Sequence, residues 1–245
     1  MKMMVFASRN TKEILRDPLN YGFGLGFPVI ILLLLSAIQA NIPVDLFEIE
    51  KLTPGIAVFG LSFISLFSSA LIAKDRSTSF LARLCASPLS AKDFILGYTL
   101  PLLPMAILQS LICFVVAFIL GLKISTNVLL ALVVLIPADI LFISIGLLAG
   151  SIFNEKQVGG ICVALLTNLT AWLSGTWFDL NLVGGAFKAI ACALPFVYTV
   201  DATRAALSGN YGDIFKNLIW VIIYAIVFLV LAVVIFNKKM KSDKI

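Results

Sequence analysis

The chain has 245 residues, of which 61% are hydrophobic and only 13% charged, and its formal net charge is +5. Soluble domains average about 25% charged residues, so this composition indicates an integral membrane protein. The basic residues lie at the ends of apolar runs and not on a basic face interleaved with aromatics, which excludes nucleic acid as a partner. The apolar runs leave no tract for a separate globular core, so one membrane domain over residues 1–245 is expected.

Several kinds of chemistry are excluded by missing residue types. Without histidine there is no HExxH zinc site and no Ser-His dyad. No GxxxxGK[ST] phosphate loop occurs, so any ATP-driven work must be powered by another polypeptide. The cysteines form no CxxC pair, so neither a metal site nor a disulfide framework is predicted, and no cofactor is expected in this chain. The four cysteines are Cys85, Cys113, Cys162 and Cys192.

The first elements are an interfacial helix and a membrane span. Residues 1–18 carry a narrow apolar stripe at helical spacing with charges on the other faces, which predicts a helix lying in the membrane interface. Asp17-Pro18 ends this helix, because proline cannot continue it. Residues 21–40 have no formal charge and match the roughly 20 residues that a ~30 Å hydrocarbon core requires.

Five more apolar runs are predicted to cross the membrane, which gives an all-α protein with six spans. These runs are residues 55–73, 94–120, 128–153, 158–178 and 218–236. In this arrangement 13 of the 18 Lys and Arg residues lie on the side of the two termini and 5 on the other side. The excess of positive charge predicts that both termini are cytosolic in a multi-pass protein of the plasma membrane.

The stretch before the last span, residues 179–217, is predicted to be an outer re-entrant region. The apolar run 182–196 would be only about 22 Å long as a helix, too short to cross the membrane. A seventh span would also move the C-terminal lysines to the wrong side. Residues 182–208 are therefore predicted to form a re-entrant pair of short helices in the outer leaflet, with their broken backbone satisfied by protein or water.

A charged elbow, residues 74–93, separates the second and third spans and is predicted to be cytosolic. Phe80, Leu81 and Leu84 recur at helical spacing, which predicts a short amphipathic helix. Arg83 lies on its opposite side. Such a helix can offer an apolar knob to a soluble partner. It can equally lie on the lipid headgroups, and periodicity does not separate these alternatives.

Two polar residues within the spans are candidates for a transport pathway or for structural hydrogen bonding. They are Asp139 in the fourth span and Asn168 in the fifth. A charge at mid-span costs at least ~2.5 kcal/mol, so Asp139 must be neutralised, paired or directed to a polar cavity. No second acid and no basic partner lies in register with it, which favours a structural role over a proton or cation site.

The outer region contains a second set of candidates. Asp201 and Arg204 are three residues apart on a predicted short helix, so they are expected to pair at the outer rim. Trp177 and Tyr198 belong to a group of aromatic residues near the outer interface. An aromatic belt is favoured there over a ligand cage, because such rings prefer the interface.

Four stretches in this order, across almost the whole chain, carry a family resemblance. They are ILRDPLNYGFGLGFP (14–28), DRSTSFLARLCASPLSAKDFILGYTL (75–100), SIGLLAGSIFNEKQ (144–157), and LSGTWFD (173–179) with LPFVYTVDATRAALSG (194–209). Together they resemble the type-two membrane subunits of ATP-binding cassette (ABC) exporters, including drug- and antibiotic-resistance permeases. In the elbow the family often has Glu-Arg-Glu, a mixture of charges that Asp75-Arg76 keeps in part.

The resemblance implies a permease that works as a homo- or heterodimer with two cytosolic ABC ATPase subunits, which bind the ATP and Mg. It also implies outward transport of a hydrophobic or amphipathic substrate such as a drug, an antimicrobial peptide or a lipid-like molecule. The ATPase would contact Phe80, Leu81, Arg83 and Leu84. Two alternatives are an intramembrane enzyme, against which the missing histidines and the lone Asp139 argue, and a self-contained secondary transporter, which would require internal repeats and a paired ion site.

Overall fold

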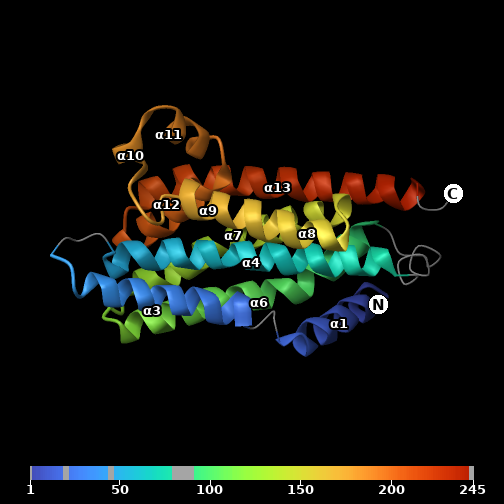
Figure 1. The fold of residues 1–245 in the computed structure, drawn as a ribbon, viewed down its shortest axis with the longest axis horizontal. Coiled ribbons are helices and arrows are strands. Elements are labelled where there is room, and N and C mark those ends of the chain that lie inside the picture. The colour runs from blue at the N-terminus through green and yellow to red at the C-terminus, as the bar shows by residue number, and fades with distance from the viewer. Residues whose placement is uncertain (1, 19–21, 44–46, 79–90, 243–245) are drawn as a thin grey trace.

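The computed structural model covers residues 1–245 and describes residues 2–18, 22–43, 47–78 and 91–242. These described residues form helices without strands, and most of the helices run along one long axis (Figure 1). Five of the helices are long and apolar enough to cross a membrane. The chain is therefore an all-α membrane protein, as its composition predicts.

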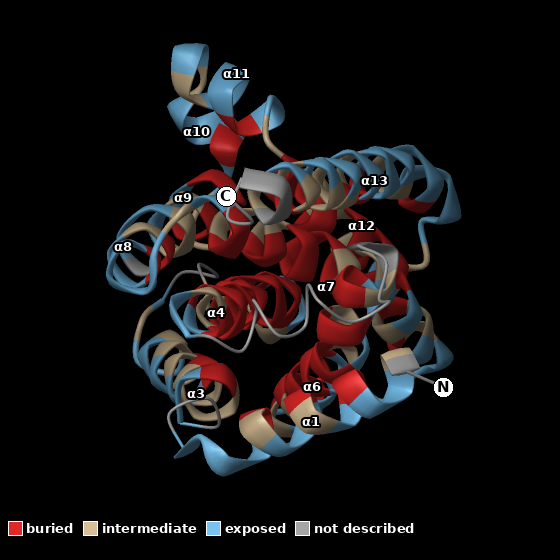
Figure 2. Cartoon of the chain, turned by 90° about the vertical axis from the view of Figure 1, so that its right-hand side faces the viewer, coloured by how far each residue is buried: buried red, intermediate tan, exposed pale blue. Residues whose placement is uncertain are grey.

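The chain begins with a helix at one end of the bundle and then enters the first apolar helix. α1 (Lys2–Arg16) packs against α6 (Ala91–Ile119) at that end (Figures 1 and 2). A π-helical turn, η1 (Gly22–Gly26), continues into α3 (Phe27–Gln39), and the two together form the first candidate span. The helix predicted over residues 1–18 is present; its position in the membrane interface stays a prediction.

The second candidate span, α4 (Ile49–Ser77), is the centre of the bundle. In its most apolar part 89% of the residues are buried, and Figure 2 shows α4 surrounded by the other helices. α6, α7 (Thr126–Ile152) and α13 (Tyr211–Ser242) are the remaining candidate spans. Five of the six predicted spans are thus confirmed as long apolar helices.

α4 and α7 pack so closely that their backbones nearly touch. A Cβ atom at Gly146 would lie 2.2 Å from the carbonyl oxygen of Ser65, and one at Gly150 would lie 2.4 Å from the carbonyl oxygen of Ser69. The Ser68 hydroxyl donates a hydrogen bond of 3.1 Å to the carbonyl of Ile143. Glycines four residues apart allow this approach, which is how membrane helices gain packing contacts without a hydrophobic driving force.

The fifth predicted span is not confirmed as a long apolar helix, unlike the other five. α8 (Glu155–Ile161), the π-helical η2 (Cys162–Thr167) and α9 (Asn168–Leu173) form one helical run that packs along α4. Its first turn is charged, and the run is not among the five candidate spans. The predicted end at residue 178 is wrong, because residues 174–178 are turns and bends. The 19-residue run is about 28 Å long, so a crossing here stays a prediction.

The outer region contains short helices, as predicted for residues 182–208. α10 (Leu180–Val183) and α11 (Gly185–Cys192) stand away from the bundle, whereas α12 (Pro195–Ser208) packs against α7, α13 and α4 (Figure 1). α11 and α12 meet at 80°, since the residue before Pro195 is extended. Such a bent pair is either a broken span or a re-entrant loop. Its depth in the outer leaflet stays a prediction.

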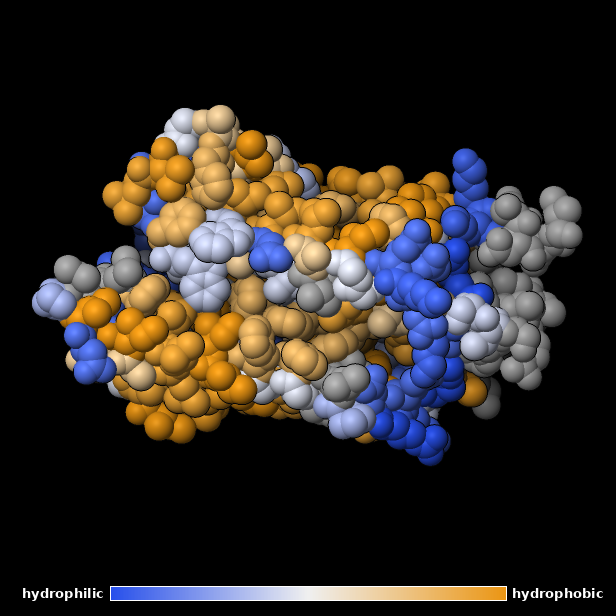
Figure 3. All heavy atoms as spheres, in the orientation of Figure 1, coloured by the Kyte–Doolittle hydropathy of each residue, from blue (hydrophilic) through white to orange (hydrophobic). Residues whose placement is uncertain are grey.

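The surface of the bundle separates into apolar and polar zones. Figure 3 shows a broad hydrophobic surface with hydrophilic side chains gathered near the end that carries α1 and the start of α8. Bulky apolar residues remain exposed along α13, among them Ile219, Ile223 and Val230. Exposing a whole apolar helix face to water is unfavourable, so this surface of α13 is suited to contact with lipid.

Candidate coupling site

The residues predicted to contact the ATPase, Phe80, Leu81, Arg83 and Leu84, lie in segment 79–90, outside the described residues. The structure does describe both flanks of this segment, the end of α4 and the start of α6. These flanks are fastened to neighbouring helices by polar contacts. We call this set of contacts the elbow clamp, defined by Arg9, Asp75, Arg76 and Tyr98.

Asp75 is the buried centre of the elbow clamp. Its side chain is 2% exposed, and its Oδ2 atom accepts hydrogen bonds from the Arg9 guanidinium at 2.7 Å and from the Tyr98 hydroxyl at 2.9 Å. These three side chains come from α1, α4 and α6. A buried carboxylate requires such partners, because burial without a counter-charge and hydrogen bonds is strongly unfavourable. The elbow clamp therefore joins three helices at the point where α4 reaches the elbow.

Apolar packing and a backbone hydrogen bond hold α1 in place beside Asp75. The Phe6 ring meets the Phe94 and Tyr98 rings edge-on, with centroids 5.6 and 4.9 Å apart. A Cβ atom at Gly97 would lie within 2.3 Å of the Phe6 ring, so only glycine permits this approach. The Asn10 amide donates a 3.0 Å hydrogen bond to the Gly97 carbonyl. α1 is thus seated on α6 at one defined position.

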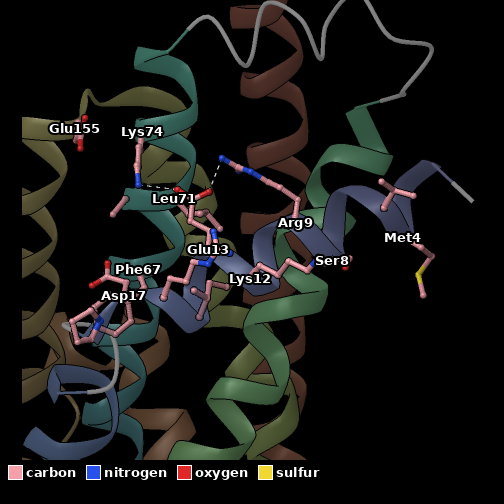
Figure 4. Close-up of a pocket in the computed structure, with 15 residues that line it drawn as sticks. Met4, Ser8, Arg9, Lys12, Glu13, Asp17, Phe67, Leu71, Lys74 and Glu155 are labelled. Carbon is pink, nitrogen blue, oxygen red and sulfur yellow. Dashed lines mark ion pairs between the residues drawn. The ribbon is translucent and has the colours of Figure 1, made fainter.

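A more exposed pair of ion contacts extends the elbow clamp toward the surface. Glu13 contacts Arg9 at 2.5 Å and Lys74 at 2.8 Å (Figure 4). The Lys74 side chain is 56% exposed. Exposed ion pairs contribute little to stability, typically about 0–1 kcal/mol. Glu13 consequently supplements the attachment of α1 to α4, for which Asp75 is the principal anchor.

Arg76 points the other way and binds the end of α7. One guanidinium nitrogen lies 2.8 Å from the carbonyls of Gly150 and Ser151 and 3.2 Å from that of Phe153. The last carbonyls of a helix lack intrahelical partners and carry partial negative charge, so a cation is favourable there. Adjacent residues of α4 therefore bind opposite neighbours: Asp75 binds α1 and α6, and Arg76 binds α7.

The partners of the elbow clamp could not be found from sequence. The sequence indicates only a mixture of charges at Asp75-Arg76, and it does not single out Arg9, Asn10 or Tyr98 as site residues. One signal was present, since adjacent opposite charges at the end of a long apolar run require partners on different faces. In the part of the chain that the structure describes, no group of ionisable residues is suited to hold a metal ion.

Of the outer candidates, Asp201 and Arg204 come within ion-pair distance of each other, and Arg204 makes the stronger contacts. Its guanidinium donates hydrogen bonds to the carbonyls of Lys51 at 3.1 Å and Gly175 at 2.9 Å. Asp201 is 4.0 Å away, at the outer limit of an ion pair. Arg204 thus ties α12 to the start of α4 and to the turn after α9, mainly through backbone carbonyls.

The two aromatic candidates make separate contacts. The Trp177 ring meets the Phe59 ring edge-on at a centroid distance of 5.7 Å. The Tyr198 hydroxyl donates a 2.7 Å hydrogen bond to the carbonyl of Cys192, and its ring stacks on Trp220 at 5.9 Å. These contacts fix parts of the outer region.

The two polar candidates inside the spans are not brought together. Asp139 is 1% exposed on α7, and its Oδ1 atom has no hydrogen-bond partner among the described residues. Asn168 lies on the exposed side of α9, where its amide donates a 2.7 Å hydrogen bond to the carbonyl of Ala164. Among the described residues, no hydrogen bond joins these two side chains.

Comparison with known proteins agrees with this architecture. The family model described as "ABC-2 type transporter" matches residues 1–208, which includes α1, the elbow, α7 and the outer short helices. A search of curated proteins finds no match. The family match covers most of the chain and confirms the resemblance carried by its four sequence stretches. The chain belongs to the ABC-2 type transporter family and is a membrane permease component of an ABC-type transporter.

Proposed function

We propose that this permease exports a hydrophobic or amphipathic substrate and is driven by separate cytosolic ATPase subunits that bind ATP and Mg. The family supports an association with ABC ATPases, and drugs, antimicrobial peptides and lipid-like molecules are the substrate classes that the proposal includes. The observation that carries the proposal is the elbow clamp. Through the elbow clamp, a force applied to the elbow would act directly on four helices.

The connection has two parts. Asp75 ties the end of α4 to α1 and α6, and Arg76 ties it to α7. Further along, the close contact at Gly146 makes α4 and α7 move together, because packed backbones cannot slide freely past each other. When ATP binding draws the ATPase subunits together, the elbow would be displaced and the α4–α7 pair would carry this displacement toward the outer region.

The proposed assembly contains two permease protomers, either identical or different, with two ATPase subunits. The two-protomer arrangement is proposed from the resemblance to ABC exporter permeases, which work as dimers. A pathway between two protomers is compatible with the buried state of α4, in which polar side chains such as Ser62, Ser65 and Ser69 are enclosed by neighbouring helices. The substrate would pass between the protomers or along their lateral surface.

We further propose that both termini are cytosolic. Figure 3 shows hydrophilic side chains gathered near α1 and the start of α8, the end to which the C-terminal helix also extends. Single cysteines introduced in a cysteine-free background at Asn41→Cys and Lys241→Cys are expected to react with a membrane-impermeant maleimide from opposite sides. Labelling of both positions in intact cells would contradict this orientation.

Replacing Phe80 by Asp is expected to abolish transport and to weaken ATPase co-purification. A fully buried Phe side chain contributes roughly 1.5–3 kcal/mol to docking, and Asp would instead place a charge against an apolar cleft. Membrane insertion should stay normal because the residue lies outside the predicted spans. The measurement compares expression, recovery of the ATPase in a pull-down, and substrate-stimulated ATP hydrolysis.

Arg83→Ala is the matched control, since it changes the opposite side of the predicted elbow helix and should have a milder effect. If Phe80→Asp binds and stimulates the ATPase normally, the elbow helix rests on lipid headgroups. The ATPase contact would then lie elsewhere on the polar end, around Asn154 or on α1.

A further inference from the structure

A groove of about 1210 Å³ opens between α1 and α4 and extends to the start of α8 (Figure 4). Three residues of α4 form an apolar wall: Phe67, Ala70 and Leu71. The groove lies at the polar end of the bundle, where the hydrophilic side chains border the broad hydrophobic surface (Figure 3). It therefore combines an apolar wall with a charged rim, at the end of the bundle that is predicted to lie in the membrane interface.

The charges at the rim are not all compensated in the same way. Arg9 and Lys74 are bound by Asp75 and Glu13 within the elbow clamp and its extension. Lys12 and Arg16 also line the groove, are exposed, and make no ion pair with another described residue. They are four residues apart on α1 and so share one side of this helix.

The other residues of α1 show that this helix faces a mixed environment. Met4, Val5 and Leu15 are 57%, 69% and 62% exposed, although they belong to a helix that also presents exposed cations. Exposed apolar residues beside exposed cations are the pattern by which an interfacial helix binds acyl chains and anionic headgroups together. Asp17 and Glu155 are the remaining acids of the lining, and Glu155 belongs to the opposite wall on α8.

We propose that this groove is a binding site for an anionic phospholipid of the adjacent leaflet. Lys12 and Arg16 bind its phosphate, and an acyl chain lies along Phe67, Ala70 and Leu71. The lipid would fill the space between α1 and α4 beside the elbow clamp. This site is separate from the elbow and its ATPase contact, and its test needs neither ATP nor substrate.

The test uses the full-length permease in nanodiscs of phosphatidylcholine with phosphatidylglycerol. After extraction into detergent, native mass spectrometry counts the phosphatidylglycerol that remains bound. Lys12→Gln with Arg16→Gln is expected to weaken this retention by about 30-fold, since each basic residue near a membrane surface contributes about a factor of five toward an anionic lipid. Ala70→Phe, which fills the groove with both cations in place, is expected to reduce retention as well.

Lys156→Gln with Lys238→Gln is the matched control, because it removes two exposed charges near the same end but outside the groove. It should retain the lipid as the unchanged protein does. The proposal is overturned if the groove variant retains as much lipid, if the control loses as much, or if phosphatidylcholine is retained equally well. Loss of dimers in Ala70→Phe with unchanged lipid retention would also overturn it and assign the groove to a second copy of the chain.

Discussion

Gly146→Ala is expected to destabilise the permease by about 1–3 kcal/mol, although it adds only one methyl group. The added Cβ would lie 2.2 Å from the Ser65 carbonyl oxygen and 2.7 Å from the Ser68 Cβ atom. The nearest atom belongs to the backbone of α4 and cannot rotate away, so α4 and α7 would have to separate. Reversible unfolding of the purified permease by SDS measures the change in unfolding free energy.

Gly159→Ala is the matched control, and its change in unfolding free energy should have the opposite sign. This glycine is also helical, but no atom lies within 4 Å of the position that its Cβ would take. Alanine there would gain up to about 1 kcal/mol from its higher helix propensity. If Gly146→Ala is as stable as Gly159→Ala, α4 and α7 do not make the close contact on which the proposed joint movement depends.

Asp75→Ala is expected to release α1 and to destabilise the permease by about 2–3 kcal/mol. Removal of one partner from a buried pair leaves the other uncompensated, which typically costs 3–5 kcal/mol. The expected value is smaller because Arg9 is 35% exposed and keeps Glu13 as a partner. The Tyr98 hydroxyl also loses its acceptor. A reporter cysteine introduced by Ala7→Cys, at a position that is 4% exposed, should be alkylated faster when Asp75 is replaced.

Glu13→Ala is the control for this experiment. It removes an acid that also contacts Arg9, but one that is 22% exposed and pairs with the exposed Lys74, so its effect should stay below about 1 kcal/mol. Equal alkylation of the Ala7→Cys reporter in all three backgrounds would show that Phe6 and Asn10 hold α1 without the buried carboxylate. If the Asp75→Ala variant transports substrate at the normal rate, the elbow clamp does not transmit the force as proposed.

Sequence analysis alone could determine the class of fold and the positions of most elements. The long apolar helices coincide with uncharged runs, because the cost of placing backbone and charge in lipid acts on each segment separately. The break before Pro195 and the end of α1 near Pro18 are equally local, since proline restricts its own backbone and that of its neighbour. The family resemblance rested on such stretches too, and it agrees with the match over residues 1–208.

Which elements are central, and which side chains meet, was decided only by the tertiary structure. α4 and the helix at 155–173 are both apolar, but only their packing shows that α4 is the enclosed one. The Arg9–Asp75 contact spans 66 residues, and the bond from Arg204 to the Lys51 carbonyl spans 153. Hydropathy and helical period describe a segment by itself. A buried charge, in contrast, is stabilised by whichever distant group the packing of whole helices brings within hydrogen-bonding distance.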